Sequence, residues 1–143
     1  MEGNKQIAKI FIDIKSTPTQ RIAKGGWARI TLREKDMVIE HSFRFKDLKD
    51  TGVADDWDEP NFSLYCKYMH RNQISCVSMN NNLSAETYRL TIESHGVGIA
   101  DYYHFDDAKT PQIIANMIWA WVYGENDLKS FIDQLPAEQR KTV

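Results

Sequence analysis

The sequence has few cysteines and no long apolar stretch, and both shortages narrow what the protein can be. Its 143 residues include two cysteines, Cys66 and Cys76, too few for a disulfide-stabilised fold. Both lie in apolar, strand-like segments, so we expect two buried, free thiols. No apolar run approaches the roughly 18 residues of a membrane span. No basic and then apolar leader is visible, so we expect a cytoplasmic protein.

Neither sign of charge dominates the composition. Lys and Arg number 18 and Asp and Glu number 20, which gives a net charge of −2 and does not indicate a strongly basic nucleic-acid-binding protein. Along the chain the charge is uneven: residues 1–45 hold nine basic and five acidic residues, and residues 46–61 hold two basic and six acidic ones. Neutralisation within the molecule explains this pattern at least as well as two partner sites do.

Recognisable signatures of catalysis and of cofactor binding are also missing. The chain contains no CxxC, HExxH or GxSxG motif, and neither a P-loop nor a dinucleotide-binding fingerprint. The acidic run 55–59 lacks the ligand spacing of an EF-hand loop. We therefore expect a non-enzymatic protein with no catalytic residues, no metal and no cofactor.

Period-2 alternation of apolar and polar residues dominates residues 6–105 and predicts about seven strands. Glu34-Lys35-Asp36 predicts a tight hairpin. A second turn at His70-Arg71-Asn72-Gln73 predicts another hairpin, with Cys66 and Cys76 on opposite faces. Asn80-Asn81-Asn82 predicts a further turn. The predicted strands are 6–15, 26–33, 37–45, 62–69, 74–79, 86–93 and 97–105, with an acidic loop at 46–61.

After residue 107 the apolar spacing changes to that of helices. Thr110 is the expected cap of a helix over about 111–123, and Asn126 the expected cap of a second over about 127–135. The polar tail 137–143 is expected to fray. The sequence thus predicts one α+β domain over residues 1–143: an antiparallel sheet followed by two C-terminal helices packed on one face.

Residues 9–45 resemble the opening of the ribonuclease H family, which begins with three antiparallel strands. Asp13 stands where that family has a catalytic Asp, and Gly25-Gly26-Trp27 where its second strand begins. Trp119–Gly124 also resembles a strand of that family, although its apolar spacing fits a helix better. The residue after Asp13 is Ile14 rather than Gly, which departs from the family. The resemblance implies a metal-dependent nuclease around Asp13, or a degenerate relative that binds nucleic acid.

The polar face of the N-terminal strands combines basic and aromatic residues. Such a face suits single-stranded nucleic acid, because bases stack on rings while phosphates pair with cations. Acidic residues such as Glu40 dilute the positive charge. This is the second hypothesis for function, and its residues are Lys9, Phe11, Lys15, Trp27, Arg29, Arg33 and Arg44.

Binding to another protein is the leading hypothesis, as an inhibitor, an immunity or antitoxin-like protein, or a subunit of an assembly. A Trp within acidic residues suits an interface, since Trp anchors interfaces and acids steer basic partners. The helix 111–123 is apolar nearly all round, which makes it a possible contact between copies of the chain. The expected partner-binding residues are Asp55, Asp56, Trp57, Asp58, Glu59 and Trp119.

Overall fold

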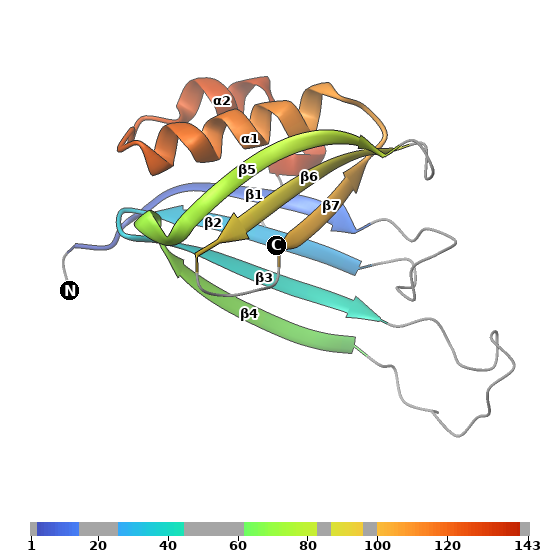
Figure 1. The fold of residues 1–143 in the computed structure, drawn as a ribbon, viewed down its shortest axis with the longest axis horizontal. Helices are drawn as coiled ribbons and strands as arrows, with labels where there is room; N and C mark the ends of the chain where they lie inside the picture. Colours follow the sequence, from blue (N-terminus) through green and yellow to red (C-terminus); the bar gives the residue numbers. More distant parts are fainter. Residues whose placement is uncertain (1–2, 15–25, 45–61, 83–86, 96–99, 141–143) are drawn as a thin grey trace, which may run out of the picture.

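The computed structural model describes residues 3–14, 26–44, 62–82, 87–95 and 100–140, without the side chains of 13–14, 26, 42–44, 62–65 and 82 (Figure 1). These residues confirm the α+β class. Four antiparallel strands form one sheet in the order β1 (Gln6–Ile14), β2 (Gly26–Arg33), β3 (Asp36–Arg44) and β4 (Phe62–His70). A second, three-stranded sheet contains β5 (Ile74–Asn82), β6 (Thr87–Ser94) and β7 (Asp101–Phe105).

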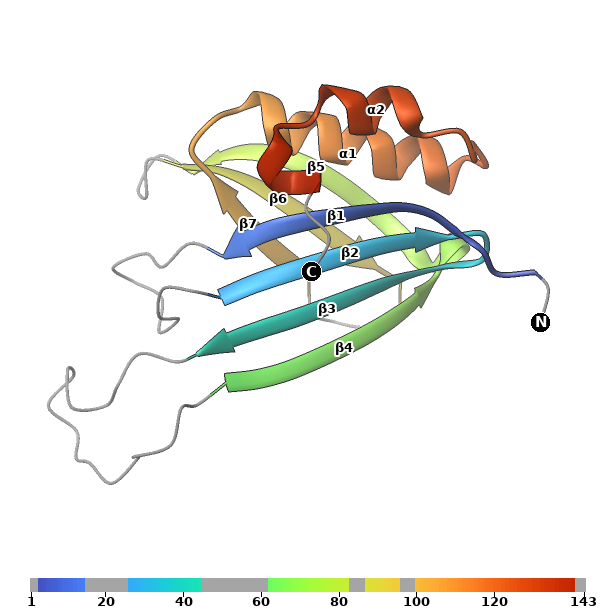
Figure 2. The same ribbon diagram turned by 180° about the vertical axis from the view of Figure 1, so that it is seen from behind.

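Two helices follow the strands and lie on the same side of the molecule. They are α1 (Lys109–Val122) and α2 (Lys129–Gln134), and short 3-10 helices occur at η2 (Arg71–Gln73) and η3 (Ala137–Arg140). Helix α1 packs on β5 and β6, and η3 lies against β1. Figure 1 and the opposite view in Figure 2 both place the helices along the side where β1 and β5 run. Within the described residues, no helix is long and apolar enough to cross a bilayer.

The core lies between the two sheets because alternation gives each strand one apolar face. Ile10, Ile30 and Ile39 stand opposite one another on β1, β2 and β3 and are fully buried. Leu90 and Ile92 of β6 complete the same core cluster from the other sheet. On each sheet, the side that points away from the core therefore carries the polar residues of the alternating strands.

Two indoles tie helix α1 to both sheets. Trp121 is fully buried, and its Nε1 donates a hydrogen bond of 2.8 Å to the carbonyl oxygen of Arg33 at the end of β2. Trp119, two residues earlier, donates from Nε1 to the carbonyl oxygen of Val77 in β5, at 2.6 Å. The Arg71 guanidinium lies 4.8 Å from the centre of the Trp121 ring. Helix α1 thus bridges the sheets through directional bonds as well as through apolar burial.

The predicted hairpin between residues 62–69 and 74–79 is wrong. Strand β4 pairs with β3, whereas β5 pairs with β6 in the other sheet. The turn itself forms, since the backbone N of His70 donates to Gln73 Oε1 at 2.6 Å. Arg71 then fixes the link to the end of the first sheet, with its backbone N bonded to Lys35 O and its side chain bonded to Glu34 O. These contacts direct the chain across from one sheet to the other.

The predicted burial of both cysteines is also wrong. Cys66 is exposed and Cys76 is half-buried, and both are free thiols. The reason is the phase of alternation in β4, where Met69 and Lys67 face the core, so that Cys66 faces outward. The predicted turn at Asn80–Asn82 instead continues β5, where Asn80 pairs with Arg89.

The helix caps differ from the predicted ones. Asp107, not Thr110, closes the start of α1: its Oδ2 accepts from the backbone N and the Oγ1 of Thr110, both at 2.8 Å. Asn126 does not cap α2, because its Oδ1 accepts from Arg71. The expected fraying of the tail is wrong for residues 137–140, which form η3 with Gln139 buried.

Candidate functional site

The outward side of the four-stranded sheet carries the aromatic and basic residues that the alternation predicted for one face. We call it the outer face, and its described members form rows across the strands. One row runs Lys9–Thr31–Val38–Tyr68 and the next runs Phe11–Arg29–Glu40–Cys66, with Trp27 and Arg33 flanking them on β2. The helices lie along the β1 side and leave the part over β3 and β4 uncovered (Figure 2).

Arg29 is held rigidly on the outer face. It stands opposite Glu40 in the register of β2 and β3, and its Nε and Nη2 donate to the two carboxylate oxygens at 2.9 and 2.8 Å. Its guanidinium carbon lies 5.7 Å from the centre of the Trp27 ring. The hydrogen bonds from Arg29 lower the pKa of Glu40, and the attraction between the opposite charges adds to that effect. Glu40 is therefore ionised at neutral pH and the pair is neutral as a unit.

Arg33 repeats this arrangement four residues further along β2. Its Nε and Nη2 donate to the carboxylate of Asp36 at 2.6 and 2.7 Å. Its guanidinium carbon lies 5.5 Å from the centre of the Tyr68 ring, on β4. The hydrogen bonds from Arg33 lower the pKa of Asp36. Two arginines are thus each fixed by a carboxylate and placed near an aromatic ring.

The aromatic side chains of the outer face differ in exposure. Phe11 and Trp27 stack with their ring centres 6.0 Å apart, and Phe11 is only 7% exposed. Tyr68 is 64% exposed. Thr31 and Val38 are buried at the floor of an open hollow of about 310 Å³, whose walls include Lys9, Arg29 and Tyr68. The hollow therefore has a floor of one apolar and one hydroxyl-bearing side chain within a polar rim.

Five of the seven residues expected for nucleic-acid binding meet on this face: Lys9, Phe11, Trp27, Arg29 and Arg33. Lys15 lies outside the described residues, and of Arg44 the structure describes the backbone in β3 but not the side chain. Sequence reasoning did not include Tyr68 among the binding residues, and it expected Cys66 to be a buried thiol. The two-residue turn between β2 and β3 would have indicated Glu40 as the partner of Arg29.

The residues expected to bind a protein partner are only partly described. Asp55, Asp56, Trp57, Asp58 and Glu59 all lie outside the described residues. Trp119 lies on α1, half-buried, with its indole N–H bonded to Val77. Its ring stacks on Tyr123, which is 83% exposed, with centres 5.7 Å apart. The exposed aromatic surface at this end of α1 therefore belongs mainly to Tyr123.

A second polar cluster lies between the sheets. Lys67 of β4 forms an ion pair of 2.9 Å with Asp101 of β7, and the side chains are 11% and 7% exposed. His41 Nε2 lies 2.5 Å from the hydroxyl oxygen of Tyr103. Burial lowers the pKa of His41, although the charge of Asp101 opposes the shift. These contacts join β3 and β4 to β7 on the side away from the helices, so we assign them a structural role.

The features that resemble ribonuclease H do not form a recognisable metal centre in the described part of the chain. Asp13 lies in β1 opposite Trp27, but its side chain is not among those described. Trp119–Val122 is helical rather than extended. Among the described residues, no group of three His, Cys, Asp or Glu side chains is placed to hold a metal ion.

Comparison with known proteins gives the chain no relative from which a role could be transferred. No protein-family model, no curated protein and no solved structure matches it.

Proposed function

We propose that this chain is a small cytoplasmic, non-enzymatic protein-binding module, such as an inhibitor or an assembly subunit, and that the outer face is its docking surface. One observation carries the proposal: Arg29 and Arg33 are each fixed by a carboxylate beside an aromatic ring on an exposed sheet face. Arg, Tyr and Trp are the residue types that dominate binding energy at protein interfaces.

Rigidity of these side chains supports binding. An arginine that is free in solution loses about 0.5–1.5 kcal/mol of rotamer entropy when an interface immobilises it. Arg29 and Arg33 have already lost much of that freedom to their bidentate pairs. Because these side chains are already ordered before binding, less of the favourable contact energy with a partner is offset by lost entropy. The affinity for the outer face would therefore be higher.

The distribution of charge favours a protein over single-stranded nucleic acid. Phosphate binding needs cations that are not already neutralised, because its driving force is release of counterions. Here Glu40 and Asp36 neutralise the two arginines, and Lys9 alone remains in excess on the described part of the face. Stacked Phe11 and Trp27 would suit bases, but the backbone of a nucleic acid would find little net positive charge.

The hydrogen-bond donors of Arg33 and the buried residues of the hollow indicate which chemical groups a partner would place there. Arg33 uses Nε and Nη2 for Asp36, so its Nη1 faces no acceptor among the described contacts. A carbonyl or carboxylate oxygen of the partner would pair there. An adjacent apolar side chain would cover Val38 and Thr31 and pack on Tyr68. We therefore expect a protein segment that places an acidic or carbonyl group beside an apolar residue.

Cys66 offers a direct test because its thiol is exposed on the edge strand β4, beside Glu40 and at the hollow of the outer face. A photo-activated cross-linker is attached to Cys66 in a Cys76→Ser background and exposed to an extract of the source cells, with and without nuclease. We expect a discrete protein adduct that persists after nuclease treatment and that Arg33→Ala with Tyr68→Ala abolishes.

The other sheet provides the matched control. Tyr102 is 51% exposed, and the guanidinium carbon of Arg89 lies 4.7 Å from the centre of its ring. This contact resembles that of Arg33 with Tyr68 but lies on a different surface. Arg89→Ala with Tyr102→Ala should leave the adduct unchanged. An adduct insensitive to the outer-face substitutions, or one made only with nucleic acid, would overturn the proposal.

A further inference from the structure

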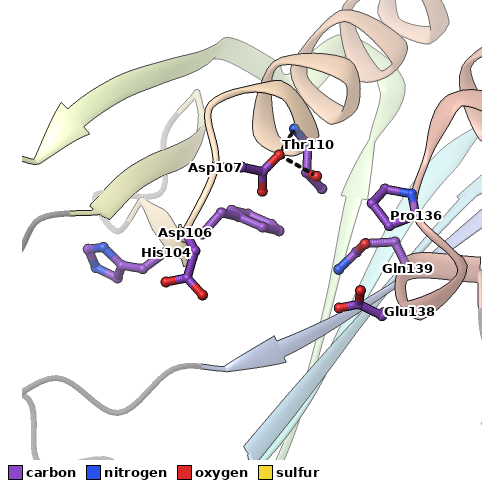
Figure 3. Close-up of a pocket in the computed structure, with 8 residues that line it drawn as sticks. His104, Asp106, Asp107, Thr110, Pro136, Glu138 and Gln139 are labelled. Atoms are coloured by element: carbon purple, nitrogen blue, oxygen red, sulfur yellow. Dashed lines mark hydrogen bonds between the residues drawn. The ribbon is translucent and has the colours of Figure 1, made fainter.

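A pocket separate from the outer face lies where the turn after β7 meets η3. It has a volume of about 250 Å³, and Figure 3 shows its side chains coming from two segments of the chain. His104, Asp106 and Asp107 come from β7 and the turn that follows it. Glu138 and Gln139 come from η3. The proposed docking surface uses none of these residues.

Gln139 is the unusual member of this pocket. Its side chain lines the cavity and is 7% exposed, yet its Oε1 has no hydrogen-bond partner among the described residues. Figure 3 shows the amide directed into the space between η3 and the β7–α1 turn. An acceptor that is buried and unsatisfied costs about 1–3 kcal/mol. A donor supplied by a ligand would remove that cost.

The charge of the pocket wall is negative. Among the described residues that line it, Asp106, Asp107 and Glu138 are acidic and none is Lys or Arg. Burial lowers the pKa of His104, and the charge of Arg89 lowers it further, so the imidazole brings no positive charge at neutral pH. A cation is therefore the ligand charge that the wall favours.

The start of α1 does not change this conclusion, although a helix N-terminus attracts anions. Asp107 already accepts from the Thr110 amide and hydroxyl, and Pro111 has no N–H to offer. A metal ion is also disfavoured, since the described residues contain no group of three acidic, His or Cys ligands placed for one.

We propose that this pocket binds a guanidinium group. A planar guanidinium has five N–H donors, so it can donate to the amide oxygen of Gln139 and to a carboxylate of the wall at the same time. The volume admits a group of side-chain size. The guanidinium belongs either to a small free molecule or to an arginine of another protein, and these two sources share the same recognition chemistry.

The test uses the full chain labelled with ¹⁵N and titrated with butylguanidinium, at constant ionic strength. We expect saturable shifts at the amides of Asp106, Thr110 and Gln139 and none with tetramethylammonium, a cation without N–H donors. A blocked Gly-Arg-Gly peptide forms the second arm. Tighter binding of the peptide would identify a protein side chain as the source, and tighter binding of butylguanidinium a small molecule.

Two variants separate recognition from folding. Gln139→Leu removes the acceptor and should weaken binding about tenfold. Glu138→Gln is an exposed change that cannot disturb the core, and it should weaken binding several-fold, whereas Glu93→Gln on an exposed strand position should have no effect. Absence of saturable shifts, equal shifts with tetramethylammonium, full affinity in the Glu138→Gln chain, or tighter binding of Ca²⁺ or Mg²⁺ would each overturn the proposal.

Discussion

Trp121 provides a quantitative test of how the two sheets are held together. Its ring is fully buried, its Nε1 donates to Arg33 O at 2.8 Å, and Arg71 lies over its face. Trp121→Phe removes the donor and leaves the carbonyl oxygen without it, which costs about 1–2 kcal/mol. The smaller ring leaves a cavity that costs about 1–2 kcal/mol more. We therefore expect the free energy of unfolding to fall by about 2–4 kcal/mol.

The assay is urea denaturation followed by far-ultraviolet circular dichroism, with the slope of the transition compared to confirm two-state behaviour. Trp119→Phe is the matched control, because it loses the same kind of bond to Val77 O from a half-buried site. Trp119 is itself only half-buried, so its smaller replacement leaves less of a cavity, and losing the hydrogen bond should cost about 1–2 kcal/mol. If Trp121→Phe costs no more than Trp119→Phe, the reasoning about α1 as a bridge is wrong.

Three further predictions concern groups outside the helix. Lys67→Met should destabilise the protein by about 3–5 kcal/mol because Asp101 keeps a buried charge, and adding Asp101→Asn should restore part of that loss in the same denaturation assay. His41 has a lowered pKa in the folded state, so the unfolded chain binds the proton more readily. Its contribution to stability is therefore present above about pH 6.5 and lost as the pH falls below that value, which Tm measured against pH will show. The substitution His41→Phe should reduce this pH dependence and leave the share of His104, whose pKa is lowered in the same direction. A thiol reagent should modify Cys66 faster than Cys76 in the native protein, and equal rates would contradict the assigned exposures.

Local patterns predicted much of the first sheet. Strands β1, β2 and β3 each have one apolar face, and the polar residues 34–36 mark the hairpin between β2 and β3. The turn of a tight hairpin sets the register of its two strands. The pairing of Arg29 with Glu40 could therefore also have been predicted from the sequence. The basic and aromatic character of the outer face was predictable for the same reason.

Other features depend on contacts between residues distant in sequence. Strand β4 has apolar residues in both phases of its alternation, and Lys67 faces the core because Asp101, 34 residues later, neutralises it there. Cys66 and Tyr68 are consequently exposed. In the same way Gln139 looks like part of a polar tail, and only the packing of η3 against β1 buries it. Sequence periodicity contains no information on either contact.

The central claim is that a protein docks on the outer face through its fixed arginines and its exposed tyrosine. The most direct measurement is the Kd, by isothermal titration calorimetry, of the partner captured through Cys66. The account predicts that Arg33→Ala with Tyr68→Ala weakens binding by at least about tenfold, as expected for interface anchors, while Arg89→Ala with Tyr102→Ala leaves the Kd unchanged. Equal Kd values for both double variants and the unaltered chain would contradict it.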